Sequence, residues 1–438
     1  MTHNEVACAA DAAQYALEAL KKAGADKAAC KVNSSKKDEF NVEANKFSLM
    51  RTLFDDELTL KALKDNKKGV TKINKLDKAS IDQAVADCIT LASSALPEEA
   101  EDIAEKIENK NFDQGIGGGD MNLLFSRTKD FIEQVRDEYP KIVLESMVSD
   151  FNSRQTTYIN SNGAEFNTNA EYYQIETMFS AKEGEKSSSF NSFSACLASL
   201  AFPFMDIDMH RTLLSESEQS LDPRMVEEKF TGKVIVTPVC YDMIWNTIRD
   251  CLLSEHSLIE GTSRWKDALD TKVADSKLTF RAAPHHPNIV AGERFTPDGY
   301  ESRDFDFIRG GVLKSFALSL YGSNKTGKPR SLNCAFGDFE ILPGETPLEK
   351  MIKDIDRGVL LNRFSGASPG PSGDVSGVAK NSFLIENGAV KCALKETMVS
   401  FNVLDIIAKI EISKELCING MKVLPWCCFD GITISGAQ

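Results

Sequence analysis

Residues 156–163 read Thr-Thr-Tyr-Ile-Asn-Ser-Asn-Gly, a β-rich run that ends in an Asn-Gly pair. An Asn-Gly pair after such a run is typical of a two-residue type I′ turn, because both central residues of that turn need a positive φ. We therefore predict a strand over residues 156–160, a turn at Asn162-Gly163 and a return strand over residues 172–179. Strands joined in this way run antiparallel.

Hairpin signals of the same kind recur along the chain. The segment 28–74 contains short β-rich runs and a predicted turn at Lys67-Lys68-Gly69, and helical patterns separate the groups of hairpins. Hairpins interspersed with helices, in place of a strict strand-helix alternation, indicate an α+β fold with mostly antiparallel sheets. Later turn signals are Asp298-Gly299, Gly310-Gly311 and Asn387-Gly388.

The length of 438 residues exceeds the usual size of a single hydrophobic core. The polar segment 215–224, which contains Asp222-Pro223, is the best candidate for a boundary between domains. We predict two domains: an N-terminal α+β domain over residues 1–220 and a C-terminal, β-rich α+β domain over residues 221–438.

The composition excludes several classes of protein. A net charge of −14 repels nucleic-acid phosphates and anionic lipid surfaces, so we expect neither nucleic acid nor a membrane as a partner. No apolar run is long enough to span a bilayer, and the first residues lack the pattern of an export signal. Eleven cysteines without a Cys-x-x-Cys pair favour reduced thiols. We expect a cytoplasmic protein.

The segment 239–253 is the predicted helix with the most functional interest. It reads Val-Cys-Tyr-Asp-Met-Ile-Trp-Asn-Thr-Ile-Arg-Asp-Cys-Leu-Leu and contains no histidine. The absence matters because of the motifs that surround this helix in the second half of the chain.

Those motifs resemble, in their order and spacing, the TldD/PmbA family, which is also called the modulator of DNA gyrase family. The first half resembles the family as well, with Val42-Glu43-Ala44-Asn45, Asn74-Lys75-Leu76-Asp77 and Asn160-Ser161-Asn162-Gly163. The resemblance covers nearly the whole chain. In the second half it rests on Gly261-Thr262-Ser263, Pro297-Asp298-Gly299, the run 308–316, Leu342-Pro343-Gly344-Glu345, Arg357-Gly358, Ser365-Gly366, the run 372–376 and the run 384–390.

The resemblance implies a subunit of a two-subunit metallopeptidase that acts on unfolded or short peptides. One subunit type of the family carries a His-Glu-x-x-x-His helix with zinc, in which histidines bind the metal and the glutamate activates a metal-bound water. Counting back from Gly261, the corresponding positions here are Asn246, Thr247 and Cys251. An amide is a feeble zinc ligand and a threonine hydroxyl cannot act as a base at neutral pH.

The chain is thus identified as the PmbA- or TldE-like subunit type, without zinc ligands, catalytic residues or a cofactor of its own. Zinc is expected in a TldD-like partner, and the role implied is to assist proteolysis or maturation of small peptides. The resemblance also suggests four residues, in turns similar to those of the family, that could bind a peptide or the partner: Arg330, Asn333, Asp374 and Ser376.

Two other functions remain open from the sequence. The chain could be a homodimeric protein that binds peptides in the groove where the peptidase would hold its substrate, but does not cleave them. It could also be a hydrolase that uses a cysteine with His256, His285 or His286 as base, which requires a thiol of depressed pKa beside an imidazole.

Overall fold

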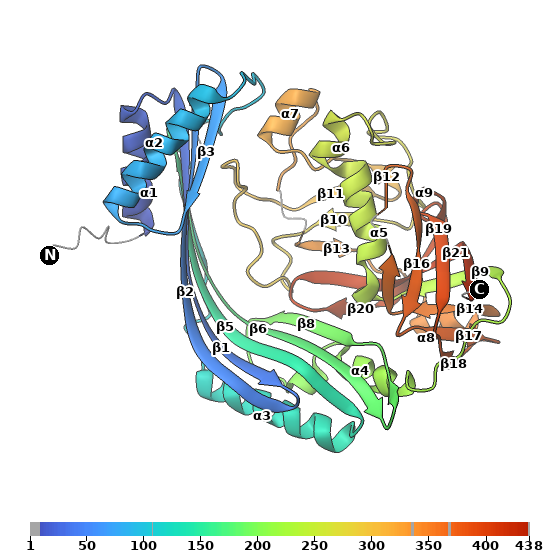
Figure 1. Cartoon of the computed structure of the whole chain (residues 1–438). Helices are drawn as coiled ribbons and strands as arrows, with labels where there is room; N and C mark the ends of the chain where they lie inside the picture. The colour runs from blue at the N-terminus through green and yellow to red at the C-terminus, as the bar shows by residue number, and fades with distance from the viewer. Residues whose placement is uncertain (1–8, 107, 334–336, 367–368, 437–438) are drawn as a thin grey trace.

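The computed structural model describes residues 9–106, 108–333, 337–366 and 369–436. Two β-sheets dominate it, one built from the first half of the chain and one from the second half. The first sheet is long and curved, and its concave face is turned toward the second sheet (Figure 1). The observed architecture is α+β with mainly antiparallel sheets, as the hairpin signals predicted.

The first sheet has the strand order β3-β2-β1-β5-β6-β4, with β7 and β8 paired to β6. All its pairings are antiparallel except that of β4 with β6. The strands are β1 (Lys27–Glu43), β2 (Lys46–Lys64), β3 (Lys67–Ile73), β4 (Lys110–Gln114), β5 (Ile142–Asn160), β6 (Glu165–Glu183), β7 (Lys186–Ser187) and β8 (Asn191–Leu197).

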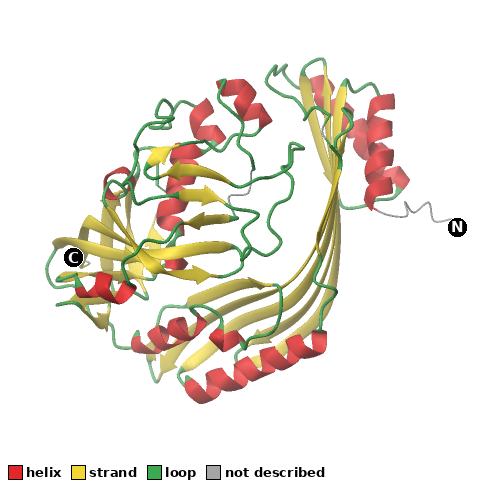
Figure 2. Cartoon of the chain, turned by 180° about the vertical axis from the view of Figure 1, so that it is seen from behind, coloured by secondary structure: helices red, strands yellow, loops and turns green. Residues whose placement is uncertain are grey.

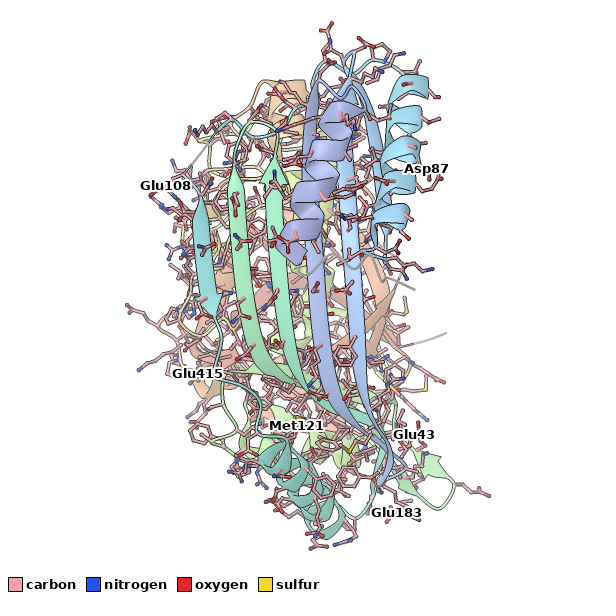
Figure 3. The ribbon with its side chains drawn as sticks, turned by 90° about the vertical axis from the view of Figure 1, so that its left-hand side faces the viewer. Glu43, Asp87, Glu108, Met121, Glu183 and Glu415 are labelled. Atoms are coloured by element: carbon pink, nitrogen blue, oxygen red, sulfur yellow. The ribbon has the colours of Figure 1, made fainter. Side chains whose placement is uncertain are left out.

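Helices α1 (Ala9–Lys22), α2 (Lys78–Ser94) and α3 (Met121–Glu138) lie on the outer, convex side of this sheet (Figures 2 and 3). Helices α1 and α2 pack on β1 and β2 through a core of small and aliphatic side chains. Helix α3 packs near the other end of the sheet, in a core rich in phenylalanine. The short helices η1 (Phe204–Asp206) and α4 (His210–Gln219) complete that core.

The second sheet is broader and more irregular, and it contains the two parallel pairs β13–β21 and β9–β14. Its long strand β21 (Lys422–Gly436) pairs with β9, β13, β19 and β20. The other strands are β9 (Phe230–Val236), β10 (Phe280–Ala282), β11 (Phe305–Arg309), β12 (Val312–Leu313), β13 (Phe339–Ile341), β14 (Arg357–Leu361), β15 (Arg363–Gly366), β16 (Asp374–Lys380), β17 (Phe383–Glu386), β18 (Ala389–Ala393), β19 (Thr397–Asn402) and β20 (Ile410–Ile418).

A segmented helix runs beside the second sheet and buries its apolar face in the largest core of the molecule. It consists of η2 (Pro238–Cys240), α5 (Asp242–Thr247) and η3 (Ile248–Leu253), followed by α6 (Glu255–Ile259). The sequence predicted one helix over residues 239–253. The backbone instead changes from 3₁₀ to α to π geometry along it. The remaining helices are α7 (Leu320–Thr326), α8 (Leu348–Lys353) and α9 (Val403–Ile406).

Several local predictions need correction. The turn predicted at Lys67-Lys68-Gly69 lies at Asp65-Asn66, where both residues have a positive φ, and Lys67 begins β3. The turn at Asn162-Gly163 is not type I′, because only Gly163 has a positive φ. Its expected flanking strands are parts of much longer ones, since β5 and β6 each contain 19 residues.

The predicted boundary between residues 1–220 and 221–438 stays a prediction. Helix α4 ends at Gln219 and β9 begins at Phe230, so each of the two sheets is contiguous in sequence. Within the described residues, no helix combines the length and the apolar character needed to cross a membrane.

Candidate functional site

A pocket with a volume of about 650 Å³ lies against the segmented helix. One wall is formed by η2, α5 and η3, and the opposite wall by the residues around β15. The start of β8, at Asn191 and Ser192, closes one side. Both halves of the chain therefore contribute to the pocket. The lining residues include Asp242, Asn246, Thr247, Asp250, Cys251, Asn362 and Arg363.

The π geometry of η3 explains why Asn246 and Cys251 line the same pocket. In a regular α-helix, two residues five positions apart lie about 140° apart around the axis, and their side chains point to different sides. A π turn closes through an i→i+5 hydrogen bond, so residues five positions apart lie closer to the same side of the helix than they do in an α-helix. The three positions that the resemblance singled out, Asn246, Thr247 and Cys251, therefore all line the pocket.

None of these three side chains is arranged for metal-assisted hydrolysis. The Asn246 amide donates a hydrogen bond of 2.9 Å to Asp242 Oδ1, and the buried Thr247 hydroxyl donates one of 2.8 Å to the Met243 carbonyl. The Cys251 thiol lies 3.5 Å from the carbonyl oxygen of Pro369. Burial and the nearby Asp250 carboxylate raise the pKa of this thiol, which keeps it protonated.

Zinc does not fit the donors present at this site. Zinc sites in proteins use histidine nitrogen, cysteine thiolate or carboxylate oxygen, usually three or four together. Across the part of the chain that the structure describes, no three such side chains come together in a group that could hold a metal ion. The amide of Asn246 is a feeble zinc ligand, and the hydroxyl of Thr247 cannot act as a base at neutral pH.

The pocket carries charges of opposite sign on its two walls. Asp242 and Asp250 lie on the helical wall, where Asp250 accepts hydrogen bonds of 2.7 and 2.9 Å from Arg249. Arg363 lies on the opposite wall; its guanidinium lies 3.5 Å from the centre of the Phe190 ring and donates a bond of 2.6 Å to the Phe190 carbonyl. Partial burial lowers the pKa of Arg363, which still remains charged at neutral pH.

Two of the four residues proposed for peptide or partner binding lie elsewhere. The guanidinium of Arg330 stacks over the Tyr300 ring at 3.7 Å, and its Nη1 atom is buried without a partner. Asn333 Nδ2 donates a bond of 2.8 Å to the Arg303 carbonyl. Neither side chain lines the pocket.

The other two residues, Asp374 and Ser376, lie on β16 and flank Val375, which does line the pocket. Because side chains alternate along a strand, Asp374 and Ser376 point to the opposite face. Asp374 Oδ1 accepts a bond of 2.9 Å from Asn402, and the Ser376 hydroxyl lies 2.8 Å from that of Ser400. The structure thus does not assemble the four residues into one site.

The cysteine-histidine alternative finds little support in the described residues. All nine cysteines described there have thiol pKa values raised by burial, whereas a nucleophilic thiol needs a lowered one. The histidines His256, His285 and His286 do not line the pocket that contains Cys251. His286 Nε2 instead lies 3.6 Å from Glu340.

Sequence reasoning missed Arg363, Asn362 and the pair Asp242 and Asp250. The two aspartates carried a usable signal, since they bracket Asn246 symmetrically at four positions on either side. Arg363 and Asn362 carried no such sequence signal, because only the tertiary fold places them in the same pocket as the helix.

Known proteins resemble this chain in sequence and in fold. Residues 230–436 match the family model described as the PmbA/TldA metallopeptidase C-terminal domain. A metalloprotease PmbA homolog from Haemophilus influenzae is 21% identical over 416 residues, which is 90% of this chain and 89% of that protein.

Two solved structures share the fold over almost their entire length. TldE from Thermococcus kodakarensis superposes with a TM-score of 0.82 at 19% identity, covering 97% of this chain and 100% of that one. A protein from Bacteroides thetaiotaomicron described as a candidate modulator of DNA gyrase gives a TM-score of 0.83 at 19% identity, covering 98% and 99%. Residues 230–436 therefore belong to the PmbA/TldD family of metallopeptidase-related domains, and the full-length relative and the shared fold support the same family for the rest of the chain.

Proposed function

We propose that this chain is the zinc-free subunit of a cytoplasmic TldD/PmbA-type peptidase complex. In this role it assists the proteolysis or maturation of small or unfolded peptides by a TldD-like partner, which holds the zinc. The observation that carries the proposal is the placement of Asn246, Thr247 and Cys251 together in the pocket beside the segmented helix, with no metal donor set around them among the described residues. The π geometry of η3 supports this placement, since it keeps residues five positions apart closer to one side of the helix.

The pocket suits a peptide segment better than a small apolar ligand. Its two aspartates can accept hydrogen bonds from a peptide amine or amide, and Arg363 can donate to a carbonyl or a terminal carboxylate on the opposite wall. These contacts bind the backbone groups of a peptide and do not select its side chains. A pocket of about 650 Å³ accommodates a few residues of an extended chain.

The proposal is tested by metal analysis and peptide cleavage with the purified chain, first alone and then mixed with a TldD-like relative from the same cell. We expect no stoichiometric zinc and no cleavage with the chain alone, and cleavage with the mixture that exceeds the activity of the relative alone. Stoichiometric zinc in the chain, or hydrolysis by the chain alone, would overturn the proposal.

Two variants separate the role of the pocket from a general effect on the fold. Arg363→Gln removes the pocket cation and should lower peptide affinity in the mixture by roughly tenfold, which is a typical loss for one charged hydrogen bond. Arg309→Gln is the matched control, since Arg309 is exposed and pairs with Asp306 on β11, away from the pocket. Peptide binding without cleavage in any mixture would favour the homodimeric peptide-binding protein instead.

A further inference from the structure

A second pocket, of about 480 Å³, lies between the concave face of the first sheet and the loop that joins β10 to β11. Figure 1 shows this loop reaching toward the sheet. Residues of β1, β2, β5 and β6 line one wall of this sheet pocket, and residues 291–295 line the other. It shares no lining residue with the pocket beside the segmented helix. Its volume lies in the range of pockets that hold small ligands.

Two cations on the sheet wall have no anionic partner. Lys31 lies on β1 and Arg154 on β5, and neither side chain forms an ion pair or a hydrogen bond with a described residue. Both point to the face of Ser35, which lies four residues from Lys31 and directly opposite Arg154. Burial and the nearby charge of Arg154 lower the pKa of Lys31. An anionic group between the two cations would relieve this repulsion.

A neutral donor lies between the two cations. Asn33 follows Lys31 on the same face of β1 and lies opposite Thr156. The Thr156 hydroxyl donates a hydrogen bond of 2.9 Å to Asn33 Oδ1, which leaves Asn33 Nδ2 available to donate to a ligand. Two cations and an amide donor are together suited to bind one carboxylate.

The carboxylates of the sheet pocket disfavour a ligand that is only anionic. Three of them already accept a hydrogen bond or form an ion pair: Glu57, Glu293 and Asp338. The side chain of Asp55 forms neither with any described residue. Asp55 and Arg154 lie directly opposite Ser35 on its two sides. Neighbouring strands lie about 4.8 Å apart, so the Cα atoms of Asp55 and Arg154 are about 10 Å apart and their side chains can hold one small ligand between them.

We propose that the sheet pocket binds a free α-amino acid as a zwitterion. Its carboxylate accepts hydrogen bonds from Arg154, Lys31 and Asn33, and its ammonium group donates to the carboxylate of Asp55. A phosphate lacks the positive charge that the surrounding carboxylates favour, and an amine alone leaves both cations unpaired. The inference does not depend on the proposed peptidase role, because the two pockets are separate.

Thermal unfolding of the purified chain with each common amino acid, at millimolar concentration, tests the proposal. We expect at least one amino acid to raise the melting temperature in a concentration-dependent way, because a ligand of the folded state stabilises it. Acetate and phosphate should have no comparable effect. If no amino acid stabilises the chain, or if phosphate does so as strongly as any amino acid, the proposal is wrong.

Derivatives of the stabilising amino acid test which charges are recognised. Its N-acetyl form has no ammonium group and its amide has no carboxylate, so calorimetry should show that each binds roughly tenfold more weakly or less. A tripeptide of the same residue carries the two charges farther apart and should also bind more weakly. Equal binding of both derivatives, or tighter binding of the tripeptide, would show that a zwitterionic amino acid is not the ligand.

Three variants test the residues. Arg154→Met and Lys31→Met should each raise the dissociation constant of the amino acid roughly tenfold. Asp55→Asn should weaken the amino acid to a similar extent and leave the weak binding of its N-acetyl form unchanged, since that form has no ammonium group for Asp55.

Lys36→Met is the matched control for these variants. Lys36 lies on the same strand as Lys31 but on its opposite face, where it pairs with Asp38 at 2.7 Å, and its loss should leave the affinity unchanged. Circular dichroism of each variant should show the natural fold. Amino-acid affinity that survives both Arg154→Met and Lys31→Met in folded protein would overturn the assignment of this pocket.

Discussion

The side-chain amide of Asn362 donates a hydrogen bond of 2.7 Å to Glu216 Oε2 and links the wall of the pocket to helix α4. Glu216 belongs to the first half of the chain and Asn362 to the second, between β14 and β15. The same amide donates to the Asn381 carbonyl at 3.0 Å, so its orientation is fixed. Burial raises the pKa of Glu216 to about 8, and this carboxyl therefore holds a proton at neutral pH.

We predict that Glu216→Gln stabilises the protein in mildly alkaline solution. The Glu216 carboxyl has a pKa near 4.5 in the unfolded chain and about 8 in the folded chain. The free energy of unfolding therefore decreases as the pH rises from 4.5 to 8, because the unfolded chain loses this proton first. Glutamine resembles the protonated carboxyl and has no such dependence. Urea unfolding should show a gain that reaches several kcal/mol above pH 8, at about 1.4 kcal/mol per pKa unit, and little change near pH 4.5.

The matched control for this prediction is Glu218→Gln. Glu218 lies on the same helix and accepts a hydrogen bond of 3.0 Å from the Lys141 backbone. This variant should produce no gain that grows with pH. If Glu216→Gln destabilises the protein equally at all pH values, then Asn362 binds an ionised carboxylate and the assignment of a bound proton is wrong.

Helix α4 also contains a second buried titratable group, His210, whose effect on stability has the opposite sign. Its ring stacks between Phe131 and Phe193 at 4.5 Å, and burial lowers its pKa from 6.5 to about 4. Between pH 6.5 and 4, His210 is protonated in the unfolded chain but stays neutral in the folded chain. The free energy of unfolding therefore decreases as the pH falls from 6.5 toward 4. His210→Phe should reduce this slope, measured by urea unfolding at several pH values. It should also lose about 1 kcal/mol at neutral pH, since its hydrogen bond to Phe204 is removed.

Gly420 lies where the hairpin of β20 and β21 meets the first sheet. Its φ is +79°, and an added Cβ would overlap the carbonyl oxygen of Cys196 on β8. The neighbouring Asn419 carbonyl accepts a bond of 2.8 Å from the Cys196 backbone. Gly420→Ala should therefore destabilise the protein by about 2 kcal/mol or more, and hydrogen exchange should accelerate at Cys196. Gly431→Ala is the control, since its φ is also +79° but nothing lies within 4 Å of the added Cβ.

The sequence predicted the features that depend on local patterns. The recurrent turn signals predicted an antiparallel α+β fold, which the two sheets confirm. The lengths of β5 and β6 were missed because polar residues such as Asn152 and Ser153 interrupt the β-rich runs. Pairing with neighbours on both sides keeps these residues in the sheet whatever their own propensity.

The candidate site was predictable only in part. Motif spacing located Asn246, Thr247 and Cys251, and all three line the pocket. The π turn that brings them together has no sequence signature, since it depends on how the helix packs in the core. Arg363 could not be found because its position follows from a contact with Phe190, 173 residues away in the chain.

Cys251 carries the one thiol among the three positions that the resemblance singled out. Its pKa is raised by burial and by Asp250, and a protonated thiol is a poor nucleophile. Cys251→Ala should therefore leave peptide cleavage by the mixture with a TldD-like relative within about twofold, as expected for a residue without a chemical role. Iodoacetamide should label Cys251 slowly below pH 7 and faster as the pH rises. Rapid labelling in mild acid, together with loss of cleavage in Cys251→Ala, would restore the cysteine hydrolase as the better explanation, because only a thiolate of depressed pKa produces both results.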